Sequence, residues 1–318
     1  MRLASSVLAL VIAGSASAVT MDWTPIGNPG NSCEVQPPIG SDPGGCFGSV
    51  DYAYSIGTYE VTNTQYAEFL NAKAKSDPLR LYTDKLGIAR DGPSGSYTYT
   101  VIAGRGEMPV NYISYYDAMR FANWLHNGQG DADTETGSYT LLGGTRVPSN
   151  AHTVMRNAWA DIVLPSVDEW YKAAYYDAAT ASYFEYPTGT NVETTCSVPT
   201  ATANTANCDN AVDNFTIKGS YTNSAGPYGT FDQGGNASEW VEAPYEFGRG
   251  RKNRGANFVL PAFTLSAPYQ GLQSSTLETG SLFQGFRLAM VPATIPEPGT
   301  GLLVAVGLVG IAVRRRLA

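Results

Sequence analysis

The residues best suited to chemistry lie in one short run, Gly229–Trp240. Asp232 and Glu239 offer hard carboxylate oxygens, and the small residues between them let the backbone curl tightly. Main-chain carbonyls can then point inward beside the carboxylates, an arrangement that suits Ca²⁺ because this ion takes several oxygen ligands in flexible geometry. From spacing alone, a glycine-rich turn with an acid at each end is favoured over a metal loop, because a short motif without context says little.

Other reactive side chains are few. The chain contains two histidines, His126 and His152, and no cysteine follows Cys208. No serine or cysteine has a suitable partner histidine nearby in sequence, as a nucleophile–base pair would require. His126 falls at the end of a predicted helix, where capping the last carbonyls is favoured over catalysis. The sequence therefore predicts no catalytic residue.

Three helices are predicted to position these segments. Each begins at a serine or threonine, which caps the first N–H groups, and each carries apolar residues on one face. The third has a Ser-x-x-Glu box, Ser166 and Glu169, directly after a proline. Residues 180–230 are rich in Thr, Asn and Ser and predict long loops that need support from a metal or disulfides. The helices are expected over residues 62–74, 114–126 and 166–178.

The four cysteines form two local pairs in the sequence. An even number in an exported chain favours the disulfides Cys33–Cys46 and Cys196–Cys208. A zinc site with four cysteine ligands is the metal alternative, but the spacing within each pair is far from that of zinc ligands.

The N-terminus reads as a secretory signal peptide, residues 1–18. A basic start, an apolar stretch and the small residues Ala16–Ala18 follow one another as in a cleavable signal. Cleavage after Ala18 would leave Val19 as the new terminus. Residues 19–49 are expected to form an N-terminal loop segment.

The C-terminus has three parts: Pro296–Pro298, an apolar run over 301–313, and Arg314–Arg316. The run is short for a membrane span, which needs about 20 residues, and the arginines favour the cytoplasmic side. The tail, residues 295–318, resembles the PEP-CTERM sorting signal. The resemblance implies an exosortase-type partner that cuts near the prolines, and export to the envelope or matrix of a Gram-negative-type bacterium. A plain membrane anchor is the alternative.

The charge balance argues against polyanionic partners. The chain has 20 Lys and Arg against 28 Asp and Glu, a net charge of −8, and removal of the terminal arginines would make the mature chain more acidic. Such a surface repels nucleic acid and anionic lipid. Before processing, contact with the membrane is expected only through the C-terminal segment.

Six segments in order resemble the formylglycine-generating enzyme family, also called the sulfatase-modifying factor family. A single motif of this kind is weak evidence for a family, but six in the same order are strong evidence. The resemblance covers residues 50–291. The segments are Tyr59–Leu70, Met108–Ala118, Leu164–Ala174, Gly229–Trp240, Arg254–Phe258 and Gly285–Leu288.

The resemblance implies an α+β domain with a C-type lectin-like fold, rich in loops, with few helices and short strands. It also implies structural Ca²⁺. The ligands would be the side chains of Asp232 and Glu239, completed by the carbonyls of Gly235 and Ala237. A second calcium site of the family would fall between Asn207 and Asp213.

The chain departs from the family at the reactive thiols. Members that oxidise sulfatase cysteines use two cysteines after a segment that corresponds here to Arg254–Phe258. A count without gaps puts Leu260 and Leu265 at these positions and Asn257 at a family serine. Thiolate chemistry has no substitute side chain. The iron-dependent branch of the family needs three histidines, and this chain has two.

Two functions follow from these residues. The favoured one is a non-catalytic, calcium-stabilised binding or structural module at the cell envelope, with a glycan or a protein as ligand. The alternative is a divergent enzyme, an oxidoreductase, on the same fold, because a fold does not determine function. Aromatic loops such as Tyr171–Tyr186 suit sugar stacking and core packing equally well.

Overall fold

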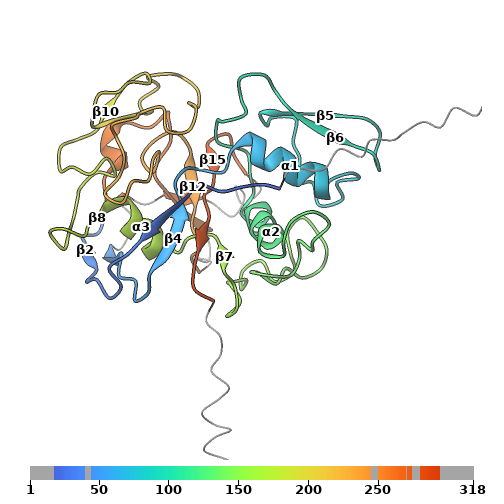
Figure 1. The fold of residues 1–318 in the computed structure, drawn as a ribbon, viewed down its shortest axis with the longest axis horizontal. Coiled ribbons are helices and arrows are strands. Elements are labelled where there is room, and N and C mark those ends of the chain that lie inside the picture. Colours follow the sequence, from blue (N-terminus) through green and yellow to red (C-terminus); the bar gives the residue numbers. More distant parts are fainter. Residues whose placement is uncertain (1–17, 40–43, 245–249, 270, 274–279, 294–318) are drawn as a thin grey trace, which may run out of the picture.

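The computed structural model describes residues 18–39, 44–244, 250–269, 271–273 and 280–293. Within these ranges the chain forms three α-helices and many short strands connected by long loops (Figure 1). The helices are α1 (Asn63–Lys73), α2 (Tyr115–His126) and α3 (Val167–Tyr175), with a 3₁₀ turn, η1 (Ala262–Leu265). This α+β, loop-rich architecture is the predicted fold class.

No strand in the described part of the chain is longer than four residues. In chain order the strands are β1 (Trp23–Ile26), β2 (Glu34–Gln36), β3 (Gly45–Phe47), β4 (Tyr54–Gly57), β5 (Ile88–Asp91), β6 (Thr98–Val101), β7 (Ile162–Val163), β8 (Tyr176–Asp177), β9 (Ser182–Tyr183), β10 (Thr195–Cys196), β11 (Thr205–Ala206), β12 (Ser238–Trp240), β13 (Arg251–Arg254), β14 (Gly271–Gln273), β15 (Gln284–Gly285) and β16 (Ala289–Met290).

The three helices begin where their sequence signals predict. The side chains of Thr62, Ser114 and Ser166 each accept a backbone N–H of the first turn. Such caps satisfy N–H groups that have no partner inside the helix. Helix α3 ends at Tyr175, earlier than predicted, because Tyr176 is extended and pairs with Tyr183 in the β8–β9 hairpin.

The first sheet joins the beginning and the end of the domain. Its order is β1-β4-β16-β7, and β16 pairs antiparallel with β4 on one side and β7 on the other. Residues 19–49, predicted as a loop segment, supply β1 to this sheet and also form the small β2–β3 hairpin. The extended N-terminal segment thus pairs with β4 and helps to hold the domain together.

The second sheet brings three distant motifs side by side. Its order is β14-β13-β12-β15, and Glu239 in β12 lies opposite Arg254 in β13 and Gly285 in β15. Three of the segments singled out in the sequence therefore meet at one place in the fold.

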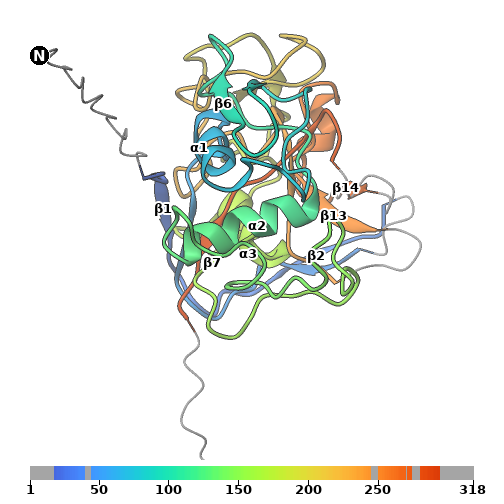
Figure 2. The same ribbon diagram turned by 90° about the vertical axis from the view of Figure 1, so that its right-hand side faces the viewer.

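Helices α1 and α2 lie next to each other (Figure 2). Aromatic side chains from both helices belong to the main core. Phe121 of α2 has its ring centroid 5.4 Å from Phe69 of α1 and 5.5 Å from Phe286. Edge-to-face pairs of this kind add about 0.5–1.5 kcal/mol beyond their buried area. Tyr171 and Tyr175 of α3 are also buried, so this part of the aromatic-rich segment belongs to the core.

Both predicted disulfides are present, Cys33–Cys46 and Cys196–Cys208, and no cysteine is free. This pairing excludes the zinc alternative. The second bridge ties β10 to the segment after β11, inside the long loop region. Closing loops of this size constrains the unfolded chain and contributes about 3 kcal/mol each.

The predicted signal peptide, apart from Ala18, and the predicted tail lie outside the described residues. In the described part of the chain, no helix combines the length and apolar character needed to span a bilayer.

Candidate functional site

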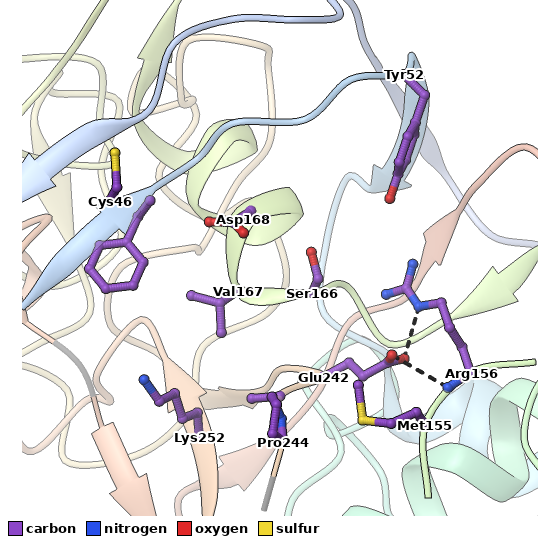
Figure 3. Close-up of a pocket in the computed structure, with 12 residues that line it drawn as sticks. Cys46, Tyr52, Met155, Arg156, Ser166, Val167, Asp168, Glu242, Pro244 and Lys252 are labelled. Carbon is purple, nitrogen blue, oxygen red and sulfur yellow. Dashed lines mark hydrogen bonds and ion pairs between the residues drawn. The ribbon is translucent and has the colours of Figure 1, made fainter.

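A cavity of about 520 Å³ opens beside the first turn of α3 (Figure 3). Parts of the chain that are far apart in sequence form its wall: β3, the start of α3, β13 and three loop segments. Its apolar surface comes from residues such as Phe47, Val167 and Met155. Its polar surface comes from Tyr52, Arg156, Ser166, Asp168, Glu242 and Lys252.

One arginine organises the polar side of this cavity. Nη1 of Arg156 donates to Glu169 Oε1 at 2.8 Å, and Nε donates to Glu242 Oε2 at 3.0 Å. Both carboxylates are buried, while the Arg156 side chain is one-fifth exposed. The hydroxyl of Tyr139 also donates to Glu242, at 2.7 Å. Arg156 therefore balances two buried negative charges at once, and it connects the first turn of α3 to the 242–244 segment.

Glu169 stays ionised in this network. Burial alone would raise the pKa of Glu169, but attraction and hydrogen bonds from Arg156 outweigh burial and hold the pKa below its usual range. The hydroxyl of Tyr52 donates to Glu169, and burial together with that charge raises the pKa of Tyr52. A general acid or base works best with a pKa near the operating pH. Both groups are shifted away from neutrality, so the network suits structure and binding.

The other polar groups of the cavity are also engaged. Asp168 accepts the N–H of Gly48 at 2.9 Å. Ser166 Oγ accepts the N–H of Glu169 as the helix cap, and Cys46 is disulfide-bonded. Among the described lining residues there is no free thiol and no histidine. A partly apolar cavity with a few oriented charges is the usual form of a site for a small ligand.

Glu239, predicted as a calcium ligand, lies in a buried ion pair. Arg287 donates to both of its oxygens, from Nε to Oε2 at 2.6 Å and from Nη2 to Oε1 at 2.7 Å. Trp170 Nε1 also donates to Oε2, at 2.8 Å. Both partners of the ion pair are fully buried. The negative charge of Glu239, which would attract a calcium ion, is therefore already balanced by the guanidinium of Arg287.

Asp232 and Glu60 belong to the same charged cluster. Asp232 accepts the N–H of Gly219 at 2.7 Å, and burial is the main reason that its pKa rises to about 6. Glu60 accepts the N–H of Ala237 at 3.0 Å. Burial, followed by the charges of Asp232 and Glu239, raises the pKa of Glu60 well above its usual range.

Glu60 has no role that was predicted from the sequence. The sequence feature that could have indicated a role for this residue is its position in the Tyr59–Leu70 motif, just before the first helix. A buried glutamate at a helix entrance requires a partner elsewhere in the chain, and that partner is the Asn236–Ala237 backbone and amide.

The structure brings Asn207 and Gly235 together but leaves Asp213 exposed. Asn207 accepts the N–H of Asn236 through its carbonyl at 2.9 Å, and a Cβ at Gly235 would lie 2.2 Å from that carbonyl oxygen. Only glycine fits there. Asn207 is buried, and its Oδ1 has no hydrogen-bond partner within the described residues.

In the described ranges, no group of three or more His, Cys, Asp or Glu side chains is placed as a metal site. The predicted ligands comprise three carboxylates, two backbone carbonyls and one amide, and the calcium assignment stays a prediction.

The two positions of the family thiols carry aliphatic side chains. Leu260 is 39 % exposed, while Leu265 is buried against Tyr186 and Cys208. Asn257, at the family serine, donates to Ser238 Oγ at 3.2 Å. Of the histidines, His126 contacts Asp161, outside its own helix.

Comparisons with known proteins place these observations in a family. The model of the sulfatase-modifying factor enzyme 1-like domain matches residues 49–291. The model of the PEP-CTERM protein-sorting motif matches residues 294–316. A search of curated proteins finds no match.

Solved structures share the fold at low identity. Treponema denticola variable protein 1 is 18% identical, with a TM-score of 0.57 over 87% of this chain and 98% of that chain. CarF is 19% identical, with a TM-score of 0.57 over 86% and 100%. PvdO from Pseudomonas aeruginosa is 15% identical, with a TM-score of 0.50 over 83% and 92%. These likenesses confirm the fold predicted from the sequence.

Proposed function

Since the chain belongs to the family of sulfatase-modifying factor enzyme 1-like domains, we propose that its domain is a non-catalytic binding module. Its PEP-CTERM motif indicates an exported protein of the cell envelope that is sorted by an exosortase-type enzyme. We propose that cleavage near Pro296–Pro298 separates the domain from the apolar run, which before cleavage holds the chain to the membrane.

The main support for the non-catalytic proposal is that the chain has no free thiol. Leucines stand at both thiol positions, and the four cysteines of the chain are paired as disulfides. A disulfide sulfur offers no thiolate for metal binding or oxidation. The chain therefore keeps the fold that positions the reactive thiols in the family, but it lacks these thiols.

We place ligand binding at the 520 Å³ cavity. It combines apolar surface from Phe47, Val167 and Met155 with charged groups whose positions are held by the Arg156 network. Side chains held in place before binding lose little freedom when a ligand arrives, and this favours affinity.

The purified domain should not convert the cysteine of a sulfatase-motif peptide into formylglycine, because no thiolate is available to begin the oxidation. Mass spectrometry of the peptide measures conversion directly, and a family enzyme that has both cysteines serves as the positive control. Formylglycine formed by this chain would contradict the proposal and favour a divergent oxidoreductase.

We also propose that a structural calcium ion binds at Asn207. The fit there is good, because Asn207 Oδ1 is a buried oxygen with no partner in the described part of the chain. The fit at Glu239 is poor, because Arg287 and Trp170 occupy its oxygens. When bound, the ion would supply positive charge that holds the loop between Asn207 and Asp213 against the Gly235 backbone.

Millimolar Ca²⁺ should raise the melting temperature of the wild-type domain. Binding to the folded state at a hundred times Kd stabilises by about 2.7 kcal/mol. The shift should disappear in Asn207→Ala and persist in the control Asp84→Asn, whose side chain is exposed. Differential scanning calorimetry measures it. If wild-type protein melts at the same temperature with calcium and with a chelator, the metal assignment is wrong.

A further inference from the structure

A second cavity, of about 310 Å³, lies beside the start of α1 and shares no lining residue with the first. Its chemistry differs from that of the first cavity. Lys85 and Arg105 line it, and no aspartate or glutamate is among its described lining residues. In a chain of net charge −8, this is a local positive site.

A buried acceptor without a partner lies in its wall. The side chain of Asn63 is almost fully buried, and its Nδ2 lies within 3.0–3.3 Å of the carbonyls of Arg105, Met108 and Pro109. These contacts fix the orientation of the amide. Its Oδ1 has no hydrogen-bond partner among the residues that the structure describes. An unpaired buried acceptor costs free energy, and a ligand hydroxyl that donates to it would remove that cost.

Gly87 lies directly against the side-chain amide of Asn63. A Cβ at Gly87, which also lines the cavity, would lie 2.8 Å from Asn63 Oδ1. A larger residue at position 87 would therefore displace the Asn63 amide.

Two more amides line the same cavity, and the protein holds one end of each. Asn111 donates to the carbonyl of Leu282 at 3.0 Å. Asn214 accepts the N–H of Phe215 at 2.8 Å. An amide carries both donors and an acceptor, so the opposite ends remain for a ligand with several hydroxyl groups.

Tyr112 adds a flat surface in a strained conformation. Its φ angle is +55°, a region that a tyrosine rarely adopts, and its N–H donates to Ser281 at 3.0 Å. Strain of this kind is found where a ligand must be held. Lys85 lies 5.3 Å from the centre of the Tyr112 ring, so the aromatic face and one cation are adjacent.

We propose that this cavity binds an anionic sugar unit. Sugar hydroxyls would pair with Asn63, Asn111 and Asn214, and the apolar face of the sugar ring would lie on Tyr112. The acidic group would pair with Lys85 and Arg105 through charge-assisted hydrogen bonds. The inference goes beyond the proposed function, because it adds a second ligand site that is separate from the 520 Å³ cavity and names the ligand class of this second site. A carboxylate on the sugar and a sulfate ester on the sugar present the same chemistry, and the experiment separates them.

The test uses the mature chain and isothermal titration calorimetry at low salt. The probes are glucuronate oligosaccharides, the same oligosaccharides as methyl esters, and a sulfated oligosaccharide. Binding of either anionic probe, with much weaker binding of the neutral ester, is the expected result. Raising the salt should weaken it, because exposed charges are screened.

The variant Lys85→Gln/Arg105→Gln should weaken binding about tenfold or more, because two charge-assisted contacts are lost. Both side chains are exposed, so the fold should be unaffected. The control Lys75→Gln/Arg80→Gln makes the same change of charge at two other exposed positions and should bind as wild type. Carboxylated and sulfated probes are ranked by affinity, and the tighter one identifies the acidic group.

Failure to bind either anionic probe, or equal affinity in both double variants, would overturn the inference. Anionic-sugar binding that survives Lys85→Gln/Arg105→Gln but is lost in Lys252→Gln would overturn it too, since it would locate binding in the 520 Å³ cavity. That last result would leave the proposed binding function standing.

Discussion

Replacing Arg287 with methionine is expected to lower the free energy of unfolding by about 3–5 kcal/mol. The change leaves Glu239 buried without its counter-charge, close to the carboxylates of Glu60 and Asp232. It also removes the donors to the carbonyls of Gly57 and Phe231. Urea unfolding measures the loss, provided that the slope with denaturant stays constant.

The matched control is Lys218→Met. Lys218 pairs with Asp22 and Glu107, whose side chains are substantially exposed, and such pairs contribute at most about 1 kcal/mol. Equal effects of the two changes would contradict the argument. Adding Glu239→Leu to Arg287→Met should recover part of the loss, because the carboxylate that was paired directly with Arg287 is then absent.

Unfolding measured with calcium and with a chelator distinguishes two roles of Glu239. If it acts only through Arg287, Glu239→Gln should destabilise the domain equally with calcium and with a chelator. If it binds the ion, the destabilisation should be larger in calcium, where wild-type protein gains stability that the variant does not.

Replacing Arg156 with methionine should cost a similar amount, about 3–5 kcal/mol, because two buried carboxylates lose one shared partner. It should also change the pH dependence. In the wild type the pKa of Glu169 lies below its ordinary value of 4.5. Its contribution to stability is therefore complete above that ordinary value and is lost as the pH falls through the lowered folded pKa.

In Arg156→Met, burial dominates and raises the pKa of Glu169 above its unfolded value. The variant should then recover stability as the pH falls from 7 towards the ordinary pKa, because protonation removes the unpaired charge. Unfolding curves across this range give the sign directly. Arg156→Lys, which keeps the charge but not the paired geometry, should lose less. Parallel pH profiles for wild type and Arg156→Met would contradict the assignment.

The helix starts could be predicted because their causes are local. Thr62, Ser114 and Ser166 lie within three residues of the N–H groups that they cap, so a short window of sequence contains the whole signal. The disulfides were predictable for the same reason, since each closes a short loop. The family motifs supplied the fold class.

The role of Glu239 could not be predicted from its type and spacing. A carboxylate that follows a glycine-rich stretch gives the same local sequence pattern whether it binds a metal or pairs with a guanidinium from elsewhere in the chain. Arg287 lies 48 residues away in sequence and reaches Glu239 because β12 and β15 are neighbours. The 520 Å³ cavity was hidden in the same way, because Arg156 lies in a loop without a motif and gains its role from Glu169 and Glu242.

The pairing of β16 has a mechanical consequence. This strand is the last one described before the sorting motif, and it lies inside its sheet between β4 and β7. If the chain is held by its C-terminus, a pulling force would enter the domain through Ala289 and Met290 and would be divided between two neighbouring strands. The load spreads into the sheet that also holds the N-terminal strand β1, so a tethered molecule would resist extension as one body instead of fraying from its anchored end.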